Sequence, residues 1–178
     1  MGTWNTRGLR GSALEDLINL TNEQYKNKKL ALIQKIPTPI KPVKIDQSTR
    51  HITLAYFDSK STVDYIGAVQ GIPVCFDAKD CATDTFPIDN IHEHQVKFME
   101  DFEGQEGIAF IIIYYSHRNE MYYLPFVKIK EFYERSITGG RKSFRFEEID
   151  ARYKIGKAPG IPVHYLEMIQ KDLESREE

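Results

Sequence analysis

The 178-residue sequence predicts one domain of the α/β class, residues 1–178, with a mixed β-sheet flanked by helices. Helix and strand patterns alternate along the chain, which is typical of that class. The run `GIAFIIIYYS` (107–116) is apolar at almost every position and predicts a central strand that is buried on both faces. An apolar content of 41% and a charged content of 28% indicate a globular protein and exclude a disordered or collagen-like chain.

The first helix is expected in `GSALEDLINLTNEQYKNKK` (11–29), with Ser12 as N-cap and Glu15 three residues later, as in a capping box. A strand follows in `LALIQKI`. The next stretch, `PTPIKPV`, has three prolines in six residues, which remove backbone donors and exclude an interior strand. We therefore expect residues 36–60 to form an exposed, stalk-like insertion within the domain.

A hairpin is expected in `STVDYIGAVQGIPVCFDAKD` (61–80), with a glycine at its turn. Side chains alternate along a strand, so Asp77 and Lys79 project together, opposite Phe76 and its apolar neighbours. We expect the Phe76 side to be the core face and the Asp77 side to be the opposite face. If Asp64 of the first strand shares the Asp77 face, two carboxylates and a lysine converge.

The remaining elements are assigned from periodicity and breakers. We expect a helix in 86–104 that starts near Asp89 or Asn90, with His92 and His94 pointing in different directions. A strand in 120–128 pairs with the central one. Short helices are expected in 129–136 and 146–152, separated by the basic loop `ITGGRKSFR` (137–145), and a last helix from Val163 to Leu173.

Two carboxylates that are held close together repel each other unless a proton or a cation lies between them. Mg²⁺ prefers oxygen ligands, activates water and neutralises charge on a phosphodiester under attack. A lysine beside the carboxylates can stabilise the charge that grows on the phosphate. The group Asp64, Asp77 and Lys79 therefore indicates a metal-dependent nuclease, although a surface ion pair between Asp77 and Lys79 is the alternative.

Charge and composition bear on partners and location. Six lysines and Arg50 lie between Tyr25 and Arg50 against Asp46 alone, which predicts one basic surface and favours a polyanionic partner. No apolar run approaches the length of a membrane span, and two cysteines are too few for a disulfide framework. We expect a cytoplasmic protein with no membrane partner.

The chain resembles the RecU-type Holliday junction resolvases, within the PD-(D/E)xK nuclease superfamily, along nearly its whole length. The residues that carry the resemblance are, in the family's order, `RGSALEDLINLTNEQY`, `KIPTPI`, `STVDYIG`, `FDAKD`, `FPIDNIHEHQ`, `GGRKSFR` and the run toward `VHYLEMI`. `HEHQ` and the `GRKS` loop are the parts most specific to this family. One departure is Asp77, where many members have a glutamate.

The resemblance implies a restriction-endonuclease-like core, built on the mixed β-sheet flanked by helices. It also implies a homodimeric endonuclease that nicks four-way DNA junctions symmetrically with Mg²⁺, for which Mn²⁺ substitutes. It implies that Thr62, Asp64, Asp77 and Gln95 surround the metal, that Lys79 stabilises the transition state and that Glu15 is a further catalytic acid. The stalk-like segment is expected to enter the junction centre. The residues expected to contact DNA are Lys35, Lys41, Lys44, Arg50, Arg141, Lys142 and Arg145.

Two alternatives stay open at this point. A restriction-like or repair nuclease would cut linear duplex as readily as a junction. A non-catalytic recombination accessory protein would bind junctions with structural rather than catalytic acids in its hairpin. The sequence also leaves open whether a recombinase or branch-migration protein binds this chain.

Overall fold

A five-stranded mixed sheet forms the centre of the protein. The computed structural model describes residues 5–58 and 62–177. The strand order is β1-β4-β5-β7-β8, with bounds β1 (Ala31–Lys35), β4 (Tyr65–Val69), β5 (Ile72–Cys81), β7 (Ile108–Tyr115) and β8 (Glu120–Pro125). Only β5 and β7 are parallel, and the other neighbouring strands pair antiparallel. The α/β class and the mixed sheet predicted from the sequence are confirmed.

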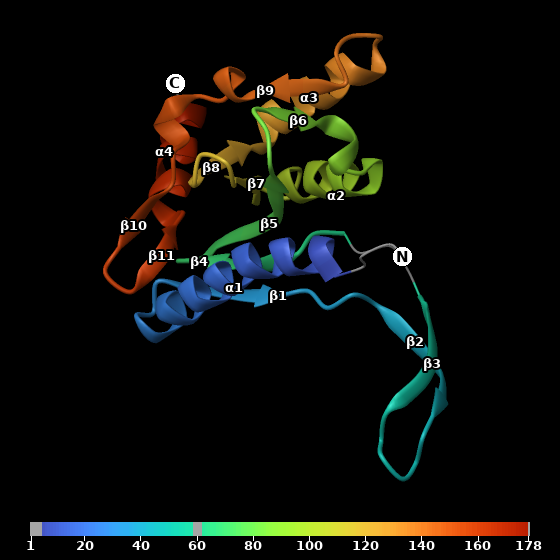
Figure 1. Cartoon of the computed structure of the whole chain (residues 1–178). Helices are drawn as coiled ribbons and strands as arrows, with labels where there is room; N and C mark the ends of the chain where they lie inside the picture. The colour runs from blue at the N-terminus through green and yellow to red at the C-terminus, as the bar shows by residue number, and fades with distance from the viewer. Residues whose placement is uncertain (1–4, 59–61, 178) are drawn as a thin grey trace.

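Helices cover both faces of this sheet (Figure 1). One core cluster joins the sheet to α1 (Asn5–Asn27), α4 (Leu166–Glu177) and the hairpin of β10 (Gly156–Ala158) and β11 (Ile161–His164). The other joins it to α2 (Glu93–Glu103) and α3 (Phe126–Ile137). The parallel β5–β7 pair needs a long crossover, and α2 lies in that connection.

The strand β5 is buried on both faces, which corrects the expectation of a single core face. Phe76 belongs to the cluster under α1, whereas Cys75 belongs to the cluster under α2. Asp77 therefore lies inside the protein with 0% of its surface exposed, and the alternative of a surface ion pair is wrong. The central position of β7 is confirmed, because Ile108 through Ile113 are all buried.

A row of stacked aromatic rings crosses the sheet beneath α1. Adjacent ring centroids are 4.7 Å apart from Tyr65 to Phe76, 4.7 Å from Phe76 to Phe110 and 4.3 Å from Phe110 to Tyr123. The four rings come from β4, β5, β7 and β8 in sheet order. Offset stacking of this kind stabilises a core beyond the area that it buries, so the row fixes the strands that carry Asp64 and Asp77.

Residues 40–57 form a hairpin that projects from the body (Figure 1). β2 (Ile40–Ile45) pairs antiparallel with β3 (Ile52–Phe57), and register shifts lie on either side of Lys44. The two strands form a sheet of their own. Nearly every residue in them is exposed.

The remaining elements differ from the sequence predictions mainly at their ends. α1 begins at Asn5, so Ser12 lies within the helix and is not its N-cap. Residues 146–152 form two 3-10 turns rather than a helix, η2 (Phe146–Glu148) and η3 (Ala151–Tyr153). A small sheet of β6 (Thr85–Pro87) and β9 (Ser143–Arg145) and the turn η1 (Ile88–Asn90) complete the fold. No helix in the described ranges is long and apolar enough to cross a membrane.

Candidate active site

Asp64 and Asp77 meet where β4 begins beside β5. The register pairs Tyr65 with Phe76, which sets the two acids next to each other. The Asp64 backbone N–H donates to Oδ1 of Asp77 at 3.2 Å, and the Ala78 N–H donates to Oδ2 of Asp64 at 3.0 Å. Each carboxyl group is thus held by a backbone N–H on the other's strand segment, and the convergence expected from the sequence is present.

Lys79 and Gln95 complete this cluster around Asp77. The Lys79 ammonium lies 2.5 Å from Oδ2 of Asp77, and its side chain is 20% exposed. The Gln95 amide nitrogen donates to the same oxygen at 2.9 Å, from the first turn of α2. The Gln95 side-chain oxygen accepts from the His92 N–H at 3.1 Å and so caps that helix. One face of the cluster is therefore fixed by a helix N-terminus.

The charge of this cluster is unbalanced without a cation. Burial, reinforced by the hydrogen bond and the negative charge of Asp77, raises the pKa of the Asp64 carboxyl to about 7. The Ala78 N–H and Lys79 act in the opposite direction but do not cancel these effects. The two carboxyl groups thus hold a proton between them at mildly acidic pH, in the place where a divalent cation would remove the repulsion.

The donor atoms fit a hard metal ion such as Mg²⁺. Within the described residues no three His, Cys, Asp or Glu side chains gather into a metal cluster, and this set contributes only Asp64 and Asp77. The other predicted ligands are Thr62, whose hydroxyl supplies oxygen, and Gln95, whose side-chain amide presents its nitrogen to Asp77 and its oxygen to the His92 N–H. Thr62 is partly buried two residues before Asp64. Mg²⁺ is commonly held by one or two carboxylates with water in the remaining positions, so the residues present suit it.

Glu15 approaches the same region from α1. Its carboxylate is paired with the Lys35 ammonium at the end of β1. The Tyr65 hydroxyl donates to Oδ1 of Asn19 at 3.1 Å and to the Glu15 carbonyl at 3.4 Å, which fastens α1 to β4 beside Asp64. Burial, followed by the negative charges of Glu15 and Asp64, raises the Tyr65 pKa well above its ordinary value.

The strand β1 also touches this region through its backbone. The Ile36 N–H donates to the Asp64 carbonyl at 2.7 Å. The chain thus leaves the body for the projecting hairpin at a residue that is hydrogen-bonded to Asp64, and it returns at Thr62.

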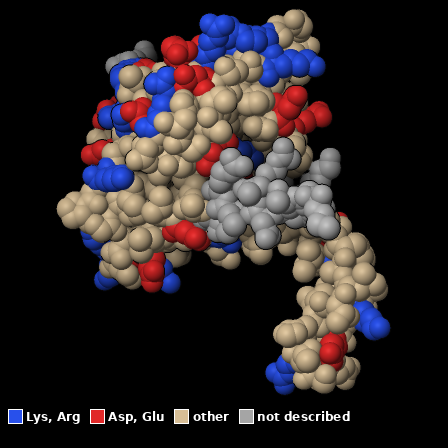
Figure 2. Space-filling view, in the orientation of Figure 1, with Lys and Arg blue, Asp and Glu red and all other residues tan. Residues whose placement is uncertain are grey.

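The residues predicted to contact DNA fall into two separate groups. Lys35, Lys41, Lys44 and Arg50 follow β1 and the projecting hairpin, whereas Arg141, Lys142 and Arg145 lie at the α3–β9 end. Figures 1 and 2 show these regions at opposite ends of the molecule, with lysines and arginines gathered where α3 and β9 lie. Three members are paired within the protein: Lys35 pairs with Glu15, Lys41 is 4.0 Å from Asp58, and Arg141 is 3.0 Å from Glu148.

Sequence reasoning missed two features of this site. His92 is the N-cap of α2 and lies outside its regular turns, so its ring stacks on that of His94, with centroids 5.4 Å apart. The spacing of His92 and Gln95, three residues apart, was the available signal, because it matches a capping box. The Tyr65 contact with Asn19 joins residues 46 apart in the chain, and no local pattern indicates it.

Comparisons with known proteins match this chain to one family along almost its whole length. The family model described as Recombination protein U matches residues 9–171. Relatives named "Holliday junction resolvase RecU" include that of Leuconostoc mesenteroides, 38% identical over 94% of this chain and 84% of the relative, and that of Lactococcus lactis, 42% identical over 92% and 78%.

A solved structure of Archaeoglobus fulgidus Hjc, described as a Holliday junction resolvase, matches with a TM-score of 0.37 and 12% identity over 66% of this chain and 74% of that one. A likeness this low supports no argument here. The family model and the curated relatives are sufficient: the chain belongs to the family of Recombination protein U.

Proposed function

We propose that this chain is a Holliday junction resolvase, an endonuclease that cuts four-way DNA junctions by metal-assisted hydrolysis of a phosphodiester. The observation that carries the proposal is the pair of the partly buried Asp64 and the buried Asp77, with Lys79 2.5 Å from Asp77, in a chain whose relatives bear that name. Two adjacent acids, of which Asp64 has a raised pKa, are costly to a fold, and groups with shifted pKa values occur preferentially at functional sites.

Each residue of the cluster has a proposed role. Thr62, Asp64, Asp77 and Gln95 would hold Mg²⁺, for which Mn²⁺ would substitute. When bound, the ion lowers the pKa of water and stabilises negative charge on the phosphate. Lys79 points its ammonium at the same place and stabilises the charge that grows on the phosphate oxygens as a water oxygen bonds to phosphorus and the sugar oxygen leaves.

Glu15 is proposed as a further acid at the edge of the site. Its ion pair with Lys35 keeps the carboxylate close to the base of the hairpin, and the Tyr65 hydroxyl holds its backbone beside Asp64. Lys35 then also lies where a DNA phosphate would approach the metal. Glu15 and Lys35 would therefore link catalysis to DNA contact.

Junction recognition is proposed to rest on the projecting hairpin and on dimerisation. Lys41, Lys44 and Arg50 give the hairpin positive charge for phosphates, and Tyr56 and Phe57 are exposed and can stack on unpaired bases. A second copy of the chain would supply the second active site that paired, symmetric nicks require. Arg141, Lys142 and Arg145 would contact phosphates at the far end of the molecule.

The test is cleavage of an end-labelled four-way junction beside a linear duplex of matched sequence, in Mg²⁺ and in EDTA. We expect symmetric nicks confined to the junction in Mg²⁺, and none in EDTA. The Lys79→Ala variant should bind the junction but not cut it. Equal cutting of both substrates would instead indicate a restriction-like or repair nuclease, and junction binding without cutting in any metal would indicate an accessory protein.

A further inference from the structure

A cavity lies at the same end of the sheet as the acid pair. At that end β4 and β8 begin and β5 and β7 end, because β5 and β7 are parallel and their neighbours antiparallel. The cavity has a volume of about 370 Å³, and Tyr114 of β7 lines it. Tyr114 pairs with Asp80, the residue that follows Lys79. Neighbouring strands are about 4.8 Å apart. Tyr114 and the cavity lie on the α1 face of the sheet, whereas Asp77 and Lys79 lie on the α2 face at the same end.

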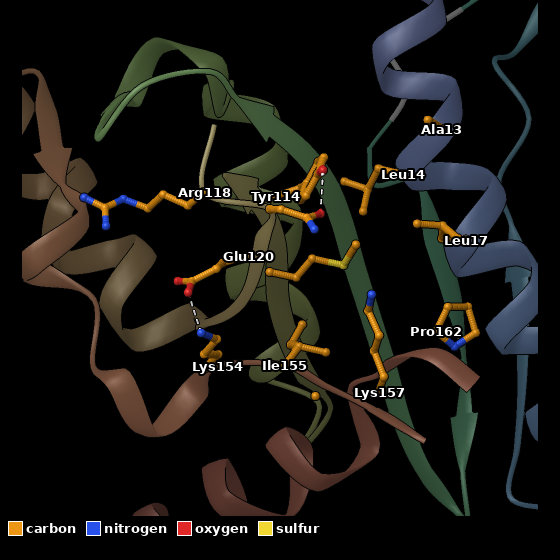
Figure 3. Close-up of a pocket in the computed structure, with 13 residues that line it drawn as sticks. Ala13, Leu14, Leu17, Tyr114, Arg118, Glu120, Lys154, Ile155, Lys157 and Pro162 are labelled. Atoms are coloured by element: carbon orange, nitrogen blue, oxygen red, sulfur yellow. Dashed lines mark hydrogen bonds and ion pairs between the residues drawn. The ribbon is translucent and has the colours of Figure 1, made fainter. Parts of the chain in front are cut away.

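The walls of the cavity are apolar. Figure 3 shows Leu14 and Leu17 of α1 pointing into it from one side, with Ile155 and Pro162 on other sides. The same helix carries Glu15 on the side that faces β1. One helix thus borders both places, and a DNA strand that passes over this end of the sheet would have the acid pair on one face and the cavity on the other.

The rim of the cavity is positively charged. Lys154 is neutralised by Glu120 at 2.5 Å, and Arg118 is paired with Asp84 and points away from the cavity in Figure 3. Lys157 points inward and has no ion pair among the residues that the structure describes. The rim is therefore left with a net positive charge that suits an anion such as a phosphate.

A hydrogen-bonding group lies beside this charge. The Tyr114 hydroxyl donates to Oδ1 of Asn119 at 3.0 Å, which leaves the Asn119 amide N–H groups able to donate to a ligand. Asparagine amides are common readers of base edges, and apolar or aromatic surfaces hold unstacked bases. The volume is at the small end of ligand sites and suits one nucleotide rather than a duplex.

We propose that this cavity, the flanking-nucleotide pocket, binds one unstacked nucleotide of the cleaved strand close to the bond that is cut. The base lies against Leu17 and the other apolar walls, and its phosphate faces Lys157. This inference rests on the proposed resolvase function and adds to it a site that can make cleavage depend on the local base sequence.

The first test places a carboxylate in the pocket. Leu17→Glu introduces negative charge where the base would lie, and Leu20→Glu is its control, because Leu20 is similarly exposed on α1 (45% against 37%) and does not line the cavity. Junctions carry 2-aminopurine at successive positions around the cut, and fluorescence is measured in EDTA to prevent cleavage. Wild type and Leu20→Glu should brighten one position as that base unstacks, and Leu17→Glu should not.

The second test removes the cation. Lys157→Ala should weaken junction binding about tenfold and lower the slope of log affinity against log salt by about 0.9, the value for one lost phosphate contact. The control is Lys28→Ala, an exposed lysine just after α1 at the opposite end of the sheet, which should leave the slope unchanged. Comparing cut positions in junctions of varied sequence should show relaxed base preference for Leu17→Glu only.

The outcomes separate this inference from the proposed function. If wild type cuts junctions in Mg²⁺ but no 2-aminopurine position brightens, or Leu17→Glu behaves as Leu20→Glu does, the pocket is not a nucleotide site and the resolvase function stands. An unchanged salt slope in Lys157→Ala would likewise remove the phosphate contact. If wild type neither binds nor cuts a junction in any metal, the proposed function and the pocket fall together.

Discussion

Two strand pairs of this chain carry similar apolar side chains and bury them to opposite extents. In β5 and β7, Phe76 and Phe110 are fully buried, and even the charged Asp77 is inside. In β2 and β3, Ile45 and Leu54 are exposed, and Phe57 is 76% exposed. An isolated two-stranded hairpin is marginally stable at best, and an apolar exposed hairpin is an aggregation risk. The central pair holds the fold and its buried charge, whereas the described residues leave the hairpin's apolar side chains exposed.

The largest effect is expected for the buried acid Asp77 and concerns the rate of junction cleavage. Asp77→Asn keeps the shape of the side chain and removes its charge, so we expect the fold to persist and junction cleavage to fall by about a thousandfold or more, since charge stabilisation by a bound metal is worth several kcal/mol. Rates from single-turnover cleavage in Mg²⁺ measure this. The control is Lys44→Gln in the hairpin, which should reduce binding but leave the rate at saturating protein within about threefold. Comparable rate losses in the two variants would contradict the separation.

Phe110 in the core and Phe57 in the hairpin should differ in how much they contribute to the free energy of unfolding. Phe110→Ala opens a cavity in the middle of the ring stack and should lower the free energy of unfolding by about 3 to 5 kcal/mol. Phe57→Ala should change it by less than about 0.5 kcal/mol, as for an ordinary surface substitution. Urea unfolding followed by circular dichroism distinguishes them. A large loss in Phe57→Ala would mean that the hairpin packs on the body or on a second copy.

Removing the hairpin should change the affinity for the junction more than the stability of the fold. Replacement of residues 40–57 by a short Gly-Ser turn should shift the free energy of unfolding by no more than about 1 kcal/mol, because nothing in the two core clusters comes from β2 or β3. We expect affinity for the four-way junction to fall about tenfold while affinity for linear duplex changes little. Competition binding between the two DNAs gives the ratio. An unchanged ratio would exclude the hairpin from junction recognition.

The last prediction concerns the way in which Asp64 makes the free energy of unfolding depend on pH. Its pKa of about 7 in the metal-free protein lies above the ordinary value of 3.8, so the folded state retains a proton that the unfolded chain has released between those pH values. The free energy of unfolding in EDTA should therefore fall as pH rises from about 4 to about 7, by up to about 1.4 kcal/mol for each pH unit.

The matched variant for this prediction is Asp64→Asn, which cannot titrate and should lack that part of the slope. Urea unfolding in EDTA at pH 5.5 and pH 7.5 compares the two proteins. Parallel pH dependence in wild type and variant would show that Asp64 is ionised throughout.

Local sequence patterns predict best the elements that are either buried on all sides or fully exposed. The apolar run around Ile111 indicated a strand buried on both faces, and the prolines 37, 39 and 42 indicated an exposed excursion, because burial and proline geometry act on each residue directly. The start of α1 at Asn5 was missed, because Ser12 resembles an N-cap equally well inside a helix.

The grouping of the candidate site's strand residues was predictable from the sequence, and their surroundings were less so. Parity along the strands brought Asp64, Asp77 and Lys79 together, as the structure has them. The second buried face of β5 depends on α2 and α3, which are added from far along the chain, and no pattern within 61–80 reports it. The Gln95 contact with Asp77 and the ion pair of Lys35 with Glu15 are likewise tertiary.

The fastening of Ile36 to Asp64 has a consequence for how the protein can be rebuilt. The hairpin is a loop whose two ends are already held together by the body, through a 2.7 Å hydrogen bond at its exit and the strand β4 at its return. Each doubling of such a loop costs only about 0.6 kcal/mol. The hairpin can thus be lengthened, shortened or exchanged for that of a relative, while the carboxylates of Asp64 and Asp77 keep their positions.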